Sequence, residues 1–207
     1  MPSKADPEKQ ASFLSETLRP LIEKSKDGLV ELFFMDDSHF VMGGVPGRLW
    51  GKVRLWIRTA SGRKRFNVLG ALNFISKKIE TVANDSYITS TQVVELLENI
   101  ALKYTDKPIA LILDNARYQK CAVVIDCAAK LGIDLVFLPT YSPNLNLIER
   151  VWKFTKSQVL NAAYIETFDA YRCTISSFVD SVDVVHNDKM ATLVTDKFQT
   201  FEKCKIL

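Results

Sequence analysis

The chain has 207 residues, of which 47% are hydrophobic, and this size fits one main domain with a sizeable core better than two. Its first residues are polar, and no run approaches the ~18 apolar residues of a membrane span, so we expect a soluble protein without a membrane partner. Four cysteines without a Cys-x-x-Cys pair and only two histidines argue against a zinc site. The net charge of +3 is unevenly spread, because nine basic residues and one acidic residue lie between positions 48 and 80.

Residues 1–28 predict a helical lead-in. Asp6 is a suitable N-cap, Pro7 stands at the first helical position, and apolar residues follow at helical spacing. Pro20 is expected to kink or split this helix, because proline lacks a backbone N–H. Gly28 is expected to end it.

A short apolar run at 29–35 predicts a buried strand that stops at two aspartates, Asp36 and Asp37. Alternating or apolar segments then predict an antiparallel meander. Its strands are expected at about 52–58, 66–74 and 77–82.

The basic residues of this region suggest a surface that follows a phosphate backbone, since Trp50, Trp56 and Phe66 are interleaved with them. A solvated hairpin would carry the same charge, so charge alone leaves both interpretations open. The candidate DNA contacts from this stretch are Arg54, Arg58, Arg63, Lys64 and Arg65.

The second half of the chain alternates helices and strands. Thr89 and Gln92 form a possible capping box at the start of a helix. Further elements are expected as a strand at 109–113, a helix at about 118–131, a strand at 134–138, a helix from 145 or 146 to 160, and one or two helices after 167. A meander followed by parallel strands between helices predicts an α/β, ribonuclease H-like fold, a mixed sheet flanked by helices, although other α/β folds share this order. We expect the catalytic domain at 29–165, with 166–207 as its helical extension.

Asp36 and Asp114 each directly follow an apolar strand, at the sheet edge where α/β folds bind ligands. Either aspartate alone is more often a turn or cap residue. Glu149, near the start of the next helix, changes this balance, because three carboxylates suit two Mg²⁺ or Mn²⁺ ions about 3.5–4 Å apart. Lys153 and Lys156 lie near the same helix side, where they could hold a DNA backbone; the alternative is an ordinary Glu–Lys helix pair.

Three segments carry a more specific pattern: Phe34–Phe40, Leu111–Ala116 and Leu138–Lys153, with 34 residues between the second and third acids. These segments resemble the three motifs of the DDE superfamily endonuclease domain of bacterial insertion-sequence transposases related to mariner elements. That spacing is characteristic of the superfamily, and Gly62–Gly70 resembles its central strand.

The resemblance implies that Asp36, Asp114 and Glu149 are the catalytic acids and the ligands of two Mg²⁺ or Mn²⁺ ions. Asp37 points the opposite way from Asp36 in a strand, so it is expected to support the site at most. His39 is expected to pack or to orient a neighbour rather than to bind metal. Loop-shaping roles, rather than metal binding, are expected for Asn115, Tyr141 and Asn146.

The resemblance also implies the reaction and the partners: cleavage and strand transfer of DNA in the transposition of an insertion sequence, acting on element ends and target DNA. Only 35 residues precede Asp36, too few for paired helix-turn-helix modules, so a recognition part is expected to be separate or fused. A homodimer on paired ends and a cytoplasmic bacterial location, at the nucleoid when DNA is bound, are expected. Two alternatives stay open: an inactive or adapted DNA-binding remnant, and a ribonuclease H-like nuclease without strand transfer.

Overall fold

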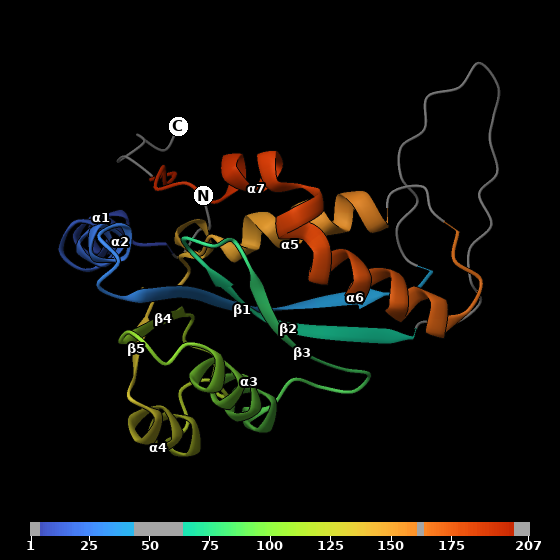
Figure 1. The fold of residues 1–207 in the computed structure, drawn as a ribbon, viewed down its shortest axis with the longest axis horizontal. Coiled ribbons are helices and arrows are strands. Elements are labelled where there is room, and N and C mark those ends of the chain that lie inside the picture. Colours follow the sequence, from blue (N-terminus) through green and yellow to red (C-terminus); the bar gives the residue numbers. More distant parts are fainter. Residues whose placement is uncertain (1–4, 44–63, 161–163, 201–207) are drawn as a thin grey trace.

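A five-stranded mixed sheet organises the protein in a computed structural model that describes residues 5–43, 64–160 and 164–200 (Figure 1). The strand order is β3-β2-β1-β4-β5. The strands are β1 (Glu31–Val41), β2 (Arg65–Asn73), β3 (Ile79–Asn84), β4 (Ile109–Leu113) and β5 (Ile133–Phe137). The first three pair antiparallel, whereas β1–β4 and β4–β5 pair parallel, which confirms the predicted mixed sheet. The predicted strand at 52–58 lies outside the described residues.

Strand β1 is longer than predicted, and its end was wrongly placed at the aspartates. The strand continues through Asp36 and Asp37 to Val41, because β2 pairs with it over Phe33–Val41. Parallel pairing with β4 ends earlier, at Phe34. At Asp36, β1 therefore still pairs with β2 but no longer pairs with β4.

Helices cover both faces of the sheet (Figure 1). Alternation along β1 divides the core: Phe33 and Met35 face α3 (Ser90–Lys103) and α4 (Ala122–Leu131), while Leu32 and Phe34 face the opposite layer. That layer contains α5 (Ile148–Val159), α6 (Phe168–Val185) and α7 (Asn187–Leu193), and the N-terminal helical segment packs into the same core. Within the described ranges, no helix has the length and apolar character needed to cross a membrane.

The N-terminal helices follow the predicted capping chemistry. The Asp6 side chain accepts from the backbone N–H groups of two first-turn residues of α1 (Pro7–Phe13). Pro20 does not end the helix. A π-helical turn at Leu14–Leu18 joins α1 to α2 (Arg19–Lys26). This wider turn accommodates the N–H group that Pro20 lacks and the carbonyl group that its ring crowds. Gly28 ends the segment with a φ of +72°.

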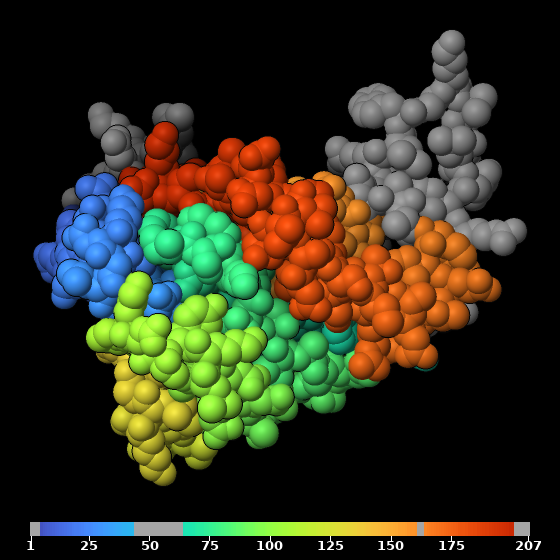
Figure 2. Space-filling model, in the orientation of Figure 1, coloured from blue at the N-terminus to red at the C-terminus, as the bar shows by residue number. Residues whose placement is uncertain are grey.

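The described N- and C-terminal segments lie side by side (Figures 1 and 2). Lys26 of α2 is 2.8 Å from the Asp196 carboxylate. Gln10 of α1 accepts a 3.0 Å hydrogen bond from Asn144, which also donates to the Gln199 carbonyl at 2.7 Å. Both chain ends therefore support the loop that carries Asn144, which precedes α5.

Two helix starts differ from the predictions. The helix expected from about 118 begins at Ala122, because Cys121 is extended (φ −86°, ψ 159°) and the preceding residues form turns. The helix expected from 145 or 146 begins as a 3-10 turn at Pro143–Leu145, followed by α5. In contrast, the predicted capping box of Thr89 and Gln92 is present at the start of α3.

Candidate metal centre

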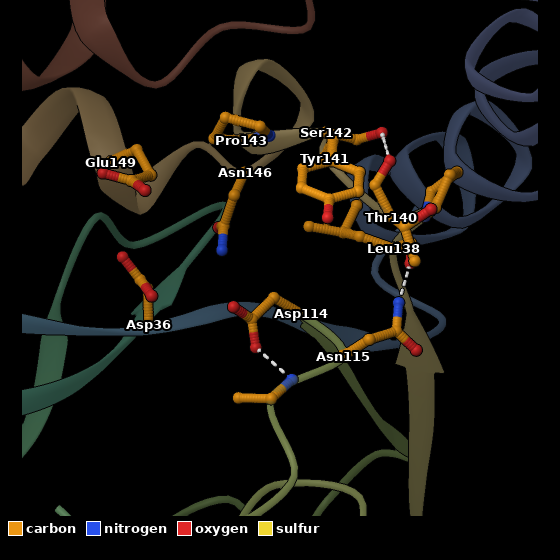
Figure 3. A pocket seen from close by; sticks show the side chains of 12 residues that line it. Asp36, Asp114, Asn115, Leu138, Thr140, Tyr141, Ser142, Pro143, Asn146 and Glu149 are labelled. Carbon is orange, nitrogen blue, oxygen red and sulfur yellow. Dashed lines mark hydrogen bonds between the residues drawn. The ribbon is translucent and has the colours of Figure 1, made fainter. Parts of the chain in front are cut away.

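Three carboxylates from separate elements line one pocket of about 400 Å³ (Figure 3). Asp36 belongs to β1, Asp114 directly follows β4, and Glu149 lies in the first turn of α5. The opposite wall is the segment 138–143. The structure thus brings together three acids that are separated along the chain by 77 and 34 intervening residues.

Strand register sets the two aspartates beside each other. The last parallel pair between β1 and β4 is Phe34 with Ile112. Asp36 and Asp114 each lie two residues farther along, so they continue the same register beyond the paired region. Since side chains two residues apart share a face, Asp36 projects on the Phe34 side of the sheet, towards α5.

Helix α5 approaches this position closely because the residue opposite Asp36 on β2 is Gly70. A Cβ atom at Gly70 would lie 2.7 Å from Cζ2 of Trp152 and 3.2 Å from Cδ1 of Ile148. Both α5 residues are buried in the core, and Glu149 lies between them in sequence at the pocket edge. The absent side chain therefore allows α5 to carry Glu149 up to Asp36.

Burial and the neighbouring acids raise the pKa values of Asp36 and Glu149. Burial is the main cause that raises the pKa of Asp36, to about 8, with further contributions from Glu149, Asp37 and Asp114. Only 9% of Asp36 is exposed, so its charge is poorly solvated. Desolvation also raises the pKa of Glu149, although this residue reaches solvent, while the ammonium group of Lys156 lowers it.

Carboxylate oxygens are the donors that Mg²⁺ and Mn²⁺ prefer, so Asp36, Asp114 and Glu149 fit a divalent ion. The described residues contain no ready-formed group of three His, Cys, Asp or Glu side chains at metal-binding distances. Ionised carboxylates that line one pocket repel one another. A divalent ion would offset that repulsion.

Asp114 is held by groups that the sequence interpretation missed. Its Oδ1 accepts a 2.9 Å hydrogen bond from the Ala116 N–H. With the Gln119 amide in the orientation that satisfies both of its groups, Nε2 donates to Asp114 Oδ1 at 2.5 Å and to the Asp114 carbonyl at 3.2 Å. Gln119 is fully buried, and no pattern in the sequence distinguished it from a surface glutamine. Asn115 donates from Nδ2 to the Leu138 carbonyl, which connects the loops after β4 and β5.

Asp37 lies on the other face of β1, as its strand position predicted. Its carboxylate accepts a 2.6 Å hydrogen bond from the Tyr118 hydroxyl and lies 3.1 Å from Nε2 of His39. Nδ1 of His39 is 2.6 Å from the side-chain oxygen Oδ1 of Asn67. Because the Asn67 amide nitrogen donates to a backbone carbonyl, Nδ1 of His39 is the donor. His39 therefore lies between Asn67 and Asp37 and does not line the pocket.

The predicted DNA contacts fall into three groups. Arg54, Arg58 and Arg63 lie outside the described residues. On α5, Lys153 is exposed. The Lys156 ammonium group lowers the pKa of Glu149, and its Nζ lies 5.5 Å from the centre of the Phe40 ring.

Lys64 and Arg65 line a second cavity, of about 610 Å³, at the start of β2. Arg65 pairs with Val41, five residues from the Asp36–Gly70 pair, so the cavity is roughly 17 Å along the sheet from the acids.

Residues 31–172 match the model of a protein family described as DDE superfamily endonuclease. A search of curated proteins finds no match. Among solved structures, the catalytic domain of Mos1 mariner transposase is 11% identical, with a TM-score of 0.61, and the match covers 98% of this chain and 100% of that one.

Two larger Mos1 structures are also similar. The Mos1 strand transfer complex matches with a TM-score of 0.66 and 13% identity, and the Mos1 mariner paired end complex with Mn matches with 0.66 and 12%. Each covers 98% of this chain, which spans only 65% and 66% of the Mos1 chains. At these identities the likeness establishes the fold, the ribonuclease H-like α/β fold expected from the order of elements.

Proposed function

Because the chain belongs to the DDE superfamily endonucleases, we propose that it is the catalytic part of a transposase, a metal-dependent enzyme that cleaves DNA and transfers the freed strand. The observation that carries the proposal is the convergence of Asp36, Asp114 and Glu149 on one pocket from three elements. The matched Mos1 structures include a strand transfer complex, which supports the second half of the reaction. The proposed element is a bacterial insertion sequence, and the proposed catalytic unit is 29–165 with a lead-in before it and a helical extension after it.

The proposed ligands of two Mg²⁺ or Mn²⁺ ions are the same three carboxylates, and the Mos1 paired end complex with Mn supports this choice. When bound, such ions lower the pKa of the attacking water and offset charge on the leaving oxygen. The protein's own contribution is positional. Strand register holds Asp36 beside Asp114, Gln119 orients Asp114, and α5 carries Glu149 into the same pocket.

The proposed DNA surface begins at the pocket and extends along the sheet. Lys156 and Lys153 lie on the helix that carries Glu149, and Lys64 and Arg65 lie about 17 Å away, roughly five base-pair steps. These cations contact phosphates without reading sequence. Arg54, Arg58 and Arg63 are proposed to extend the same surface. A helix-turn-helix part, separate or fused, is proposed to select the element ends, on which two copies of the enzyme act.

The proposal is tested with the full chain, alone and fused to a helix-turn-helix domain, on labelled duplex DNA in Mg²⁺ or Mn²⁺. We expect nicking that requires the ion, and joining of the freed 3′ end to a second duplex. Asp114→Asn should bind DNA as the parent does and cleave at least 100-fold more slowly, because it removes a charged oxygen without changing shape. Equal cleavage by this variant would refute the metal-dependent mechanism.

The same assay separates the alternatives. Cleavage without joining would identify a nuclease that lacks strand transfer. DNA binding that survives chelation, with no cleavage by the parent in either ion, would identify a binding remnant. A control variant, Asp126→Asn, removes an exposed carboxylate on α4 that does not line the pocket, so its cleavage rate should equal that of the parent.

A further inference from the structure

The pocket contains a buried polar group that the acids do not explain. Asn146 lies between the 3-10 turn and α5, is only 3% exposed, and lines the pocket with the three carboxylates. In Figure 3 its amide lies among the three acids, with Asp36 and Glu149 to its left and Asp114 below it. The Asn146 Oδ1 atom is buried and has no hydrogen-bond partner among the described residues.

The amide nitrogen of Asn146 fixes the orientation of this side chain. Nδ2 of Asn146 donates a 2.9 Å hydrogen bond to the backbone carbonyl of Met35, the residue before Asp36. Rotating the amide by half a turn would set two acceptor oxygens against each other, so Oδ1 must point away from Met35. A buried acceptor without a partner is rare, because the desolvated oxygen has lost its water without a replacement.

The surroundings decide what kind of partner fits. The acids that line the pocket with Asn146 are Asp36, Asp114 and Glu149. When they hold a divalent ion these carboxylates are ionised, so they accept hydrogen bonds and cannot donate to Oδ1 of Asn146. A divalent cation interacts favourably with all four groups, and asparagine carbonyl oxygens are common ligands of hard cations. Being neutral, such a ligand also adds no charge to a crowded acidic site.

We propose that Asn146 Oδ1 supplies a fourth, neutral oxygen to the coordination of a divalent ion held by the acids, an inference that rests on the proposed metal-dependent function. The side chain then has two roles. Its nitrogen ties the start of α5 to β1 through Met35, and its oxygen binds the ion. This goes beyond the loop-shaping role expected from the sequence.

Asn144, two residues earlier, provides a matched control. Its Nδ2 also donates to neighbouring chain segments and its Oδ1 is also buried without a partner, but it does not line the pocket. Asn144→Ala and Asn146→Ala should therefore both lower the unfolding temperature of the metal-free protein. Only Asn146→Ala should also weaken binding of the ion.

The measurement is a Mn²⁺ titration followed by the electron paramagnetic resonance signal of free Mn²⁺, together with unfolding temperatures in chelator and in saturating Mn²⁺. We expect Asn146→Ala to bind Mn²⁺ at least tenfold more weakly, and to lose most of the rise in unfolding temperature that Mn²⁺ gives the parent. Asn144→Ala should keep both within twofold. Parent-like Mn²⁺ affinity in folded Asn146→Ala would overturn the proposal.

A second variant covers the case in which Asn146→Ala does not fold. Asn146→Asp keeps the shape and an oxygen but loses the donor to Met35, so the metal-free protein should be less stable while Mn²⁺ binding is retained. Loss of binding in Asn146→Asp would show that the oxygen is not the essential group and would count against the proposal.

The outcomes also separate this inference from the proposed function. If the parent binds Mn²⁺ and Asp114→Asn does not, but Asn146→Ala does, the metal centre stands and only the role of Asn146 fails. If the parent itself binds no Mn²⁺, both proposals fail together.

Discussion

Replacing Gly70 with alanine would test whether the close approach of α5 to the sheet positions Glu149. The added Cβ would lie 2.7 and 2.9 Å from two ring carbons of Trp152, whereas carbon atoms pack best at about 3.5–4.0 Å. Trp152 or the whole helix must therefore move by about 1 Å. Overpacking of this kind costs about 1–3 kcal/mol of stability, and a displacement of about 1 Å in a catalytic group can reduce a rate by about 100-fold.

The assay pairs urea unfolding with Mn²⁺-dependent nicking of DNA. We expect Gly70→Ala to lose stability and, when still folded, to nick much more slowly than the parent. Trp152→Phe removes the part of the indole ring that would collide, so the double variant should recover part of both losses. If Gly70→Ala keeps the stability and the nicking rate of the parent, the reasoning from close approach is wrong.

Three further predictions concern stability. Because the pKa of Asp36 is raised from 3.8 to about 8, the metal-free folded protein keeps a proton that the unfolded chain releases; its stability should fall as pH rises through this range, and Asp36→Asn should flatten the slope in urea unfolding. Tyr141 has a φ of +59°, so Tyr141→Gly should be more stable than Tyr141→Ala by about 1–2 kcal/mol in thermal unfolding; equal stabilities would contradict this. Thr89→Ala should cost about 1 kcal/mol by removing the capping box, whereas an unchanged urea midpoint would show that the cap is unimportant.

Local signals in the sequence predicted most of the elements correctly. The N-cap at Asp6, the capping box at Thr89 and the apolar runs of β2 and β4 depend on residues close together in the chain, and all are present. The predicted end of β1 was wrong for a different reason. Whether a strand continues through two aspartates depends on its neighbour β2, and nothing near Asp36 or Asp37 reveals that partner.

In the candidate site, too, local signals predicted some residues and contacts between distant segments determined others. The motifs and their spacing selected Asp36, Asp114 and Glu149 in preference to the other acids of the chain, and strand alternation separated Asp36 from Asp37. Gln119 was not selected, because burial and contact with Asp114 give a glutamine its significance and neither is visible in the sequence.

The sequence by itself therefore predicted the three acids that line one pocket, the type of most helices and strands, and the family, since each prediction depends on short patterns or on fixed spacing. Only the tertiary structure decided how the acids meet. The pairing of Phe34 with Ile112, the contact of Gly70 with Trp152 and the unpartnered oxygen of Asn146 each depend on packing between distant segments. Distance and orientation between such segments follow from packing and hydrogen bonding across the whole fold.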